Sequence, residues 1–285
     1  MEQKNYSSIS PTAKLLLLSK GYTDIPFARE TAELISRPGV YTLQPESIDI
    51  TAAMRMVHFE LRYKSIDQLL AGLAIHNILE LSSGFSFRGL AAVQDKPVTY
   101  IDTDLPELIA TKQQMAAELQ AHIQPKGTLE ILPLNALDEA AFREIVNKFP
   151  AGELAIVNEG LLMYLEWEEK KQLCSIIRNV LQERGGYWIT ADVYVKMRDS
   201  YSQMNTNDEL EKYLEQHKVE EKKFDSFEHA EAFFNEQGFV VDKEAEEDYL
   251  AMGSIKYVIA NLTPEQLASP GKPPRIQATW RLRLK

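Results

Sequence analysis

The stretch NILELSSGFSFRG, residues 77–89, decides how the chain is expected to fold. Its apolar run Ile78–Leu81 predicts a buried strand, and the small residues Ser82–Gly84 predict a tight turn that leads into a helix. Backbone N–H groups of such a turn can approach a ligand closely. Because the turn lacks a full GxGxxG pattern and its helix opens with the bulky Phe87 and Arg88, the pattern favours a nucleoside over a pyrophosphate.

Acidic residues follow the next expected strand, about twenty positions beyond the turn. Asp102 and Asp104 stand in YIDTDLP, and a carboxylate at this place can accept both hydroxyl groups of a ribose. Two simpler interpretations stay open. Glu80 could be an exposed residue at a strand end, and Asp104 could merely cap the helix that begins near Pro106.

Short apolar runs alternate with longer helical patterns along the chain, which predicts an α/β fold with a parallel, doubly wound sheet. The expected strands are Ile78–Leu81, Val98–Ile101, Leu129–Leu132, Leu154–Val157, Tyr187–Thr190 and Phe239–Val241. The last segment differs, because apolar residues from Ile276 to Leu284 alternate with polar ones. This period of two predicts a half-buried antiparallel strand that closes the sheet.

Two regions are expected to lie outside the sheet. Before the first strand, helical patterns occur at Thr12–Lys20, Ala28–Ile35 and Ile50–Leu73. The segment Val193–Phe224 is expected to form a helical cap over the carboxyl ends of the strands, where open α/β sheets bind ligands. We therefore expect one domain, with a helical extension at 1–75, a core at 76–192, a cap insertion at 193–225 and the rest of the core at 226–285.

Composition excludes several classes of partner. The 285 residues carry a net charge of −11, whereas a nucleic-acid binder needs clustered Lys and Arg to neutralise phosphates. No apolar run approaches the ~20 residues that cross a membrane, and the polar start MEQKN lacks an apolar signal core. Cys174 is the single cysteine, and the Cys and His pairs of a zinc site are missing. We expect a cytoplasmic, metal-free protein without nucleic-acid or membrane partners; the oligomeric state is not predicted.

Several motifs resemble those of the leucine carboxyl methyltransferase family, which includes bacterial O-methyltransferases linked to polyketide synthesis. The most specific is EGLLMYL at Glu159–Leu165, which matches the family's segment after strand four. The turn at 82–88 resembles the family's Gly-Ala-Gly-Leu-Asp-Thr-Arg, and residues 104–106 resemble its Asp-Phe-Pro. Residues 24–28 resemble its Asp-Pro-Tyr-Ala, and LRYKSID at 61–67 resembles its LRTRAID helix. The similarity covers most of the chain.

The resemblance implies a class I methyltransferase fold that uses S-adenosylmethionine, releases S-adenosylhomocysteine and needs no metal. It implies that Lys14 and Arg62 hold the methionine carboxylate and that Glu159 contacts the amino group or shapes the methyl-transfer cavity. The residues that it assigns along the rest of the cofactor are Glu80, Ser82, Gly84, Asp104, Leu105, Asn135 and Ala136. The sequence departs from the family at Ser82 and Ser86, which replace a glycine and an aspartate, and at Asn135, which replaces a common acid.

The sequence identifies neither the methyl acceptor nor a catalytic residue. The implied reaction is transfer to a carboxyl or hydroxyl oxygen of a small molecule or a peptide. A carboxylate needs no general base, whereas a hydroxyl would be helped by one. Of the five histidines, only His58, one helical turn before Arg62, is a candidate. Two alternatives are a degenerate methyltransferase fold that serves as a binding protein, and a nicotinamide-dependent oxidoreductase, which the missing GxGxxG disfavours.

Overall fold

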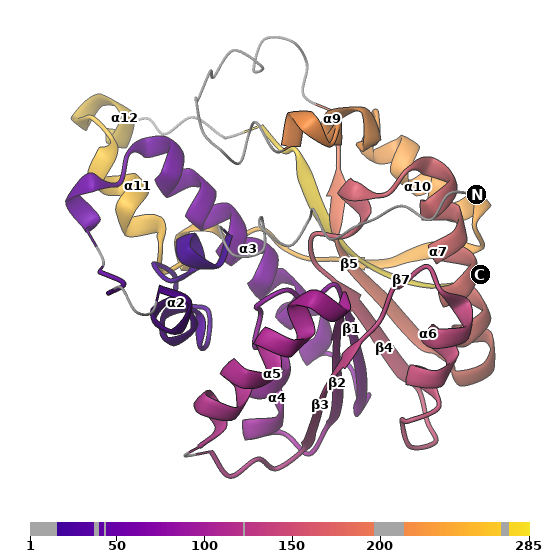
Figure 1. Ribbon diagram of the computed structural model, residues 1–285. Coiled ribbons are helices and arrows are strands. Elements are labelled where there is room, and N and C mark those ends of the chain that lie inside the picture. Colours follow the sequence, from indigo (N-terminus) through magenta and orange to yellow (C-terminus); the bar gives the residue numbers. More distant parts are fainter. Residues whose placement is uncertain (1–15, 37–39, 43, 122, 197–213, 269–273) are drawn as a thin grey trace.

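The computed structural model describes residues 16–36, 40–42, 44–121, 123–196, 214–268 and 274–285. Its centre is a seven-stranded sheet in the order β3-β2-β1-β4-β5-β7-β6 (Figure 1). The strands are β1 (Asn77–Leu81), β2 (Thr99–Asp104), β3 (Thr128–Pro133), β4 (Leu154–Asn158), β5 (Gly186–Tyr194), β6 (Phe239–Glu244) and β7 (Gln277–Leu284). The five neighbouring strands β3, β2, β1, β4 and β5 are parallel to one another, and β7 is antiparallel to both β5 and β6. This arrangement confirms the expected class I methyltransferase sheet.

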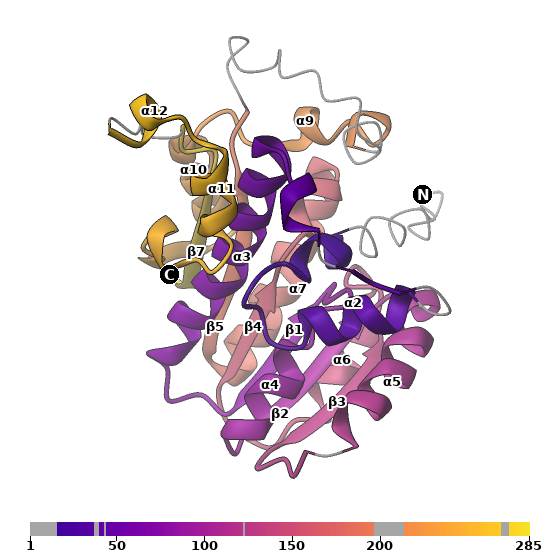
Figure 2. The same cartoon turned by 90° about the vertical axis from the view of Figure 1, so that its left-hand side faces the viewer.

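Helices cover both faces of the sheet (Figures 1 and 2). Helices α3 (Ile50–Ala71), α4 (Arg88–Asp95) and α5 (Pro106–Gln120) pack on one face, and α6 (Glu139–Val146), α7 (Trp167–Arg184) and α10 (Phe227–Glu236) pack on the other. Successive residues of a strand point to opposite faces of the sheet. In β1, Ile78 packs in the cluster with α3, α4 and α5, and Leu79 packs in the cluster with α6, α7 and α10. Because helices cover both faces, the central strands are continuously apolar. The sequence therefore showed these strands as short apolar runs.

The amino-terminal extension is helical, as expected. Residues 16–20 are helical, and α2 (Ala28–Ser36), the short η2 (Pro45–Ser47) and α3 follow. The sequence did not predict the helices between β6 and β7, namely η5 (Tyr249–Ala251), α11 (Ile255–Asn261) and α12 (Pro264–Ala268). Met252 packs there against Val57 and Leu61 of α3. The chain therefore returns to the extension before it completes the sheet.

The expected cap begins later than the sequence indicated. Strand β5 continues through Tyr194 because Val193 is fully buried and pairs with Ala278 of β7. Residues 197–213, which make up most of the expected cap, lie outside the described residues. The chain returns through α9 (Val219–Lys222), and Val195 then forms a β-bridge with Phe224.

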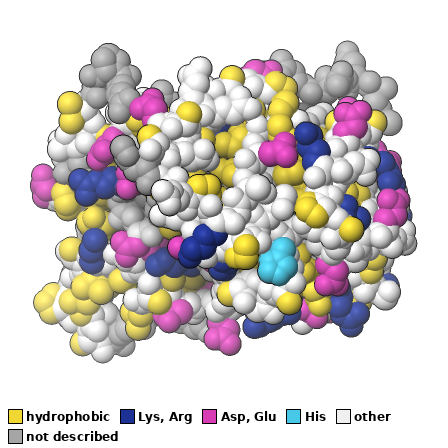
Figure 3. Space-filling model, turned by 90° about the horizontal axis from the view of Figure 1, so that it is seen from below, with side chains coloured by type: hydrophobic (Ala, Val, Ile, Leu, Met, Phe, Trp, Pro, Cys, Tyr) yellow, Lys and Arg dark blue, Asp and Glu magenta, His cyan; other side chains and the backbone are white. Residues whose placement is uncertain are grey.

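Charges of both signs are interspersed on the surface. Lys and Arg side chains lie among Asp and Glu side chains on the face that Figure 3 shows. Within the described part of the chain, no helix is long and apolar enough to span a membrane. Nor do the described residues contain three or more His, Cys, Asp or Glu side chains grouped so that they could hold a metal ion.

Candidate functional site

A cavity opens at the carboxyl ends of the first four strands, where the topology of open α/β sheets favours ligand binding. The expected site residues that line it are Arg62, Glu80, Ser82, Gly84, Asp104, Leu105, Asn135, Ala136 and Glu159. Lys14 is the remaining expected residue, and it lies outside the described residues. Residues that are up to about a hundred positions apart thus share one cavity wall.

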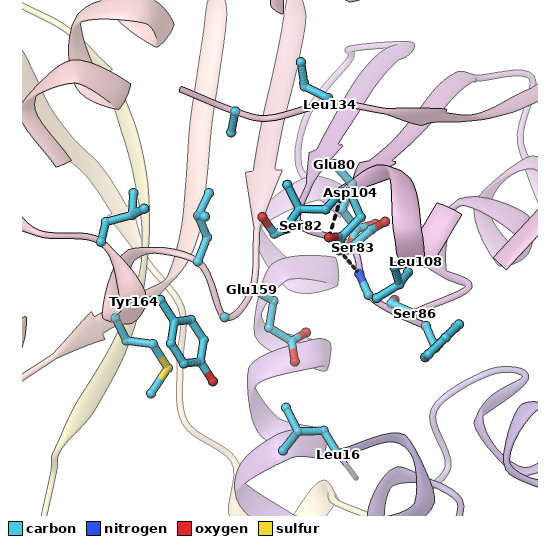
Figure 4. Close-up of a pocket in the computed structure, with 18 of the residues that line it drawn as sticks. Leu16, Glu80, Ser82, Ser83, Ser86, Asp104, Leu108, Leu134, Glu159 and Tyr164 are labelled. Carbon is cyan, nitrogen blue, oxygen red and sulfur yellow. Dashed lines mark hydrogen bonds between the residues drawn. The ribbon is translucent and has the colours of Figure 1, made fainter. Parts of the chain in front are cut away.

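The turn after β1 is held from the end of β2 (Figure 4). Ser82 and Gly84 both have positive φ angles, +51° and +52°, so the chain reverses in the left-handed region. Asp104 accepts a hydrogen bond from the Gly84 N–H at 2.7 Å and another from the Leu105 N–H at 2.7 Å. Burial raises the pKa of the Asp104 carboxyl, although these two N–H donors oppose the rise.

Asp104 does not cap helix α5. The helix begins at Pro106, its N-cap residue is Leu105, and no side chain makes the capping hydrogen bond. The simpler interpretation of Asp104 as a helix cap is therefore wrong. Instead, its carboxylate joins the turn to the end of β2, and it faces the cavity together with the turn.

Glu80 is not an exposed strand-end residue, so that interpretation is also wrong. Its side chain is almost completely buried. The Tyr100 hydroxyl donates to one Glu80 oxygen at 2.5 Å, and the Arg88 Nε lies 3.4 Å from the other. Arg88 also pairs with Asp67 and donates to Glu159 at 3.3 Å. Arg88 therefore links Glu80, beneath the turn, to Glu159 on the cavity wall.

Three cations surround Glu159. Lys20 Nζ lies 2.6 Å from one carboxylate oxygen, with Arg62 Nη2 3.9 Å from the same oxygen, and Arg88 contacts the other. Burial alone would raise the pKa of Glu159, but Lys20, Arg62 and Arg88 lower it to about 2. The group is a permanent anion at neutral pH, among donors that could also meet the carboxylate of a ligand.

Lys20 is a site residue that the motif comparison missed. It follows the apolar run Leu15–Leu18 by two positions, and the family-like spacing had directed attention to Lys14 instead. One signal in the sequence could have identified Lys20: it ends an apolar helical run and directly precedes Gly21. Its ammonium is only slightly exposed and faces the cavity.

Asp192, on β5, was also missed. Its buried carboxylate lies 3.2 Å from Arg62 Nη2 and accepts the backbone N–H groups of Gly160 and Leu161 at 2.7 Å each. The side chain of Asn158 donates to it at 2.7 Å. One carboxylate therefore shapes the loop after β4 and also orients Arg62. A lone Asp in an apolar strand gave no spacing signal in the sequence.

The far wall of the cavity is mostly apolar. Asn135 and Ala136 follow β3, and the Asn135 side-chain oxygen accepts the Leu137 N–H at 3.1 Å. Leu161, Met163 and Tyr164, in and beside the short helix η3 (Leu162–Tyr164), line the cavity beyond Glu159. Figure 4 shows Glu159 projecting into the space between the Ser82–Ser83 turn and the side chain of Tyr164.

His58 is placed away from the described cavity wall. Its Nε2 lies 2.7 Å from the Tyr194 hydroxyl, and it is not among the residues that line the cavity. Burial, followed by the charge of Arg62, lowers the pKa of His58 to about 3. A neutral ring at physiological pH could accept a proton, but this ring is engaged with Tyr194 and does not face the cavity.

Comparison with known proteins identifies the fold. No family model and no curated protein matches the sequence. A solved structure of a DUF574 family protein from Streptomyces avermitilis has a TM-score of 0.54 at 12% identity, over 96% of this chain and 97% of the other. Mitomycin 7-O-methyltransferase has a TM-score of 0.49 at 13% identity, over 92% of this chain and 59% of that protein.

Magnesium protoporphyrin IX methyltransferase from Synechocystis, solved with bound S-adenosylhomocysteine, has a TM-score of 0.48 at 9% identity. That match covers 86% of this chain and 91% of the other. The resemblance to the leucine carboxyl methyltransferase family therefore rests on the sequence motifs alone. At 12% identity, the match to the DUF574 family protein establishes a shared fold and nothing finer.

Proposed function

We propose that the chain is an S-adenosylmethionine-dependent methyltransferase that transfers a methyl group to a carboxyl or hydroxyl oxygen. One observation carries the proposal. The turn after β1, the carboxylate of Asp104, the cation Arg62 and the anion Glu159 line a single cavity at the carboxyl ends of the strands. S-adenosylmethionine presents a ribose diol, a carboxylate and an ammonium group, and these side chains offer a complementary group for each.

The individual side chains fit this cofactor. Asp104 would accept the ribose hydroxyls with the lone pairs that the backbone N–H groups leave unused. Arg62 and Lys20 would hold the methionine carboxylate. Arg62 Nε is buried and has no hydrogen-bond partner among the described residues. Glu159 would attract the ammonium group, and Leu105, Asn135 and Ala136 would border the adenine.

The bound cofactor would supply a sulfonium-activated methyl group, so the chain's own residues need mainly to position the acceptor. Leu161, Met163 and Tyr164 would exclude water and hold an apolar part of the acceptor against the methyl group. No histidine is found among the described cavity-lining residues. An acceptor that is already a carboxylate fits this wall best, because it needs no general base to become a nucleophile.

Calorimetry with S-adenosylhomocysteine and with NAD tests the cofactor. We expect binding of S-adenosylhomocysteine and no measurable heat with NAD. The reverse result would exclude a methyltransferase and support an oxidoreductase. Transfer of a labelled methyl group is then measured on matched panels of apolar carboxylic acids and alcohols. Tight cofactor binding without transfer to any acceptor would favour the degenerate binding protein.

A further inference from the structure

A buried lysine lies beneath the turn after β1. Lys112, on α5, is completely buried, and its Nζ donates to the Ser83 hydroxyl at 2.7 Å. The same Nζ lies 3.0 Å from Oδ2 of Asp102, which is also completely buried. The lysine therefore joins helix α5, strand β2 and the turn at one point.

Ser83 transmits this contact to the backbone of the turn. Its hydroxyl accepts from Lys112 and donates to the Thr103 carbonyl at 3.2 Å. Its backbone N–H also donates to the Thr103 carbonyl, at 2.9 Å. The next residue, Gly84, is held by Asp104. The turn is thus fixed from two sides, by Asp104 near the cavity and by Lys112 from below.

Stability alone does not explain a lysine in this place. Burying both charges of an ion pair is so costly that apolar replacements are often as stable or more stable. The adjacent Ser82, however, adopts a left-handed conformation at φ +51°. That conformation costs a residue with a Cβ atom about 1–2 kcal/mol and is routine only for glycine, with Asn and Asp occasional exceptions. A turn with serine here needs additional contacts to stay in this conformation.

We propose that Lys112 is a positioning residue that ties the Ser83 hydroxyl to the Asp102 carboxylate and so holds the Ser82–Gly84 turn ready for the cofactor. The inference rests on the proposed function, because it assumes that this turn binds S-adenosylmethionine. Lys112 acts through Ser83, without itself lining the cavity. A purely structural lysine would affect the melting temperature and leave the cofactor affinity of the folded protein unchanged.

Calorimetry with S-adenosylhomocysteine on the full chain tests the proposal. Lys112→Met is combined with Asp102→Asn, so that no buried carboxylate loses its counter-charge. We expect affinity to fall about tenfold, which corresponds to ~1.4 kcal/mol and is the scale of a hydrogen bond to a charged group. Gln113→Met is the matched control, because Gln113 is the next residue on α5 and donates to the Ile131 carbonyl of β3, away from the turn. It should lower the melting temperature and change affinity by less than about twofold.

Ser83→Ala provides an independent measurement, because it removes the contact and leaves the buried ion pair in place. It should weaken binding by a similar factor, and adding it to the double variant should cause little further loss. Affinities of the folded variants equal to that of the wild type would overturn the positioning role. Failure of the wild type itself to bind S-adenosylhomocysteine would instead reject the proposed function, and the positioning role with it.

Discussion

Asp104 is the residue at which the turn, strand β2 and the cavity meet. Its two oxygens accept the N–H groups of Gly84 and Leu105, and both oxygens keep lone pairs that can face a ligand. It orders the turn, and in the proposed cofactor complex it would also offer a charged acceptor to the ribose. These two contributions can be separated, because an amide in its place keeps an oxygen acceptor and loses the negative charge.

We expect Asp104→Ala to weaken S-adenosylhomocysteine binding by about 1–3 kcal/mol, the scale of losing a charged hydrogen-bond partner. Asp104→Asn should cause a smaller loss of affinity, since one oxygen can still accept from Gly84. Calorimetry gives the affinities and thermal denaturation the stabilities. A variant that melts earlier and binds as tightly as the wild type would show that Asp104 is only structural.

Residues that take part in a local motif could be predicted from the sequence, whereas isolated ones could not. Glu159 and Arg62 stand within family-like segments, and the structure gathers both at the cavity. Lys112 stands alone in the amphipathic helix PELIATKQQM, and a lysine in such a pattern normally faces solvent. Its burial depends on Asp102 and Ser83, which approach it only through the tertiary fold.

At the scale of elements, the loop after β4 is clamped by two lysines from different helices. Lys170, in the first turn of α7, donates to the carbonyls of Leu165 and Lys222 at 2.8 Å each. Lys222, which ends α9, donates to the Tyr164 carbonyl at 3.0 Å. Since Tyr164 and Leu165 line the cavity, the clamp joins α9 to the cavity wall.

Burial, followed by the nearby charge of Lys222, lowers the pKa of Lys170 to about 8. The unfolded chain, with a lysine pKa near 10.5, binds more protons between pH 8 and 10.5, so Lys170 makes stability rise with pH in this window. We expect Lys170→Met to lose about 1–3 kcal/mol at pH 7 and to lack this rise. Urea unfolding at pH 7 and at pH 10 measures both effects.

Lys171→Met is the matched control for this clamp, because Lys171 is the next residue on α7 and its half-exposed side chain pairs only at the surface with Glu168. It should keep the pH dependence of the wild type and lose little stability. If Lys170→Met retained the wild-type rise between pH 8 and 10.5, the rise would have to come from other groups.

Elements with a strong apolar period were predictable, and elements without one were not. Every expected strand is present. The central strands are continuously apolar because helices cover both of their faces, whereas β7 was predictable from its alternation of apolar and polar residues. Helices α11 and α12 have seven and five residues and contain no buried residue. They leave too weak a pattern to detect, although α11 covers part of α3 through partly buried residues such as Tyr257.

At the scale of the whole molecule, the cavity joins the amino-terminal extension to the sheet. Leu16, Leu17 and Lys20 line it from one side, and the turn after β1 and the loop after β4 line it from the other. Leu17 is buried, and Lys20 pairs with Glu159 across 139 positions of sequence. A ligand that touches all these parts stabilises the closed arrangement in proportion to its binding free energy.

Hydrogen exchange tests this connection. We expect S-adenosylhomocysteine to slow amide exchange in residues 16–21 as well as in the Ser82–Gly84 turn, by up to about a hundredfold at ~100 times the dissociation constant. Helix α10, on the opposite face of the sheet, should be little affected and serves as an internal reference. In Lys20→Met, protection of the turn should persist and protection of residues 16–21 should diminish, because the pair with Glu159 is lost. Protection that is confined to the turn in the wild type would mean that the extension does not close over the ligand, and that the cavity is completed by the sheet alone.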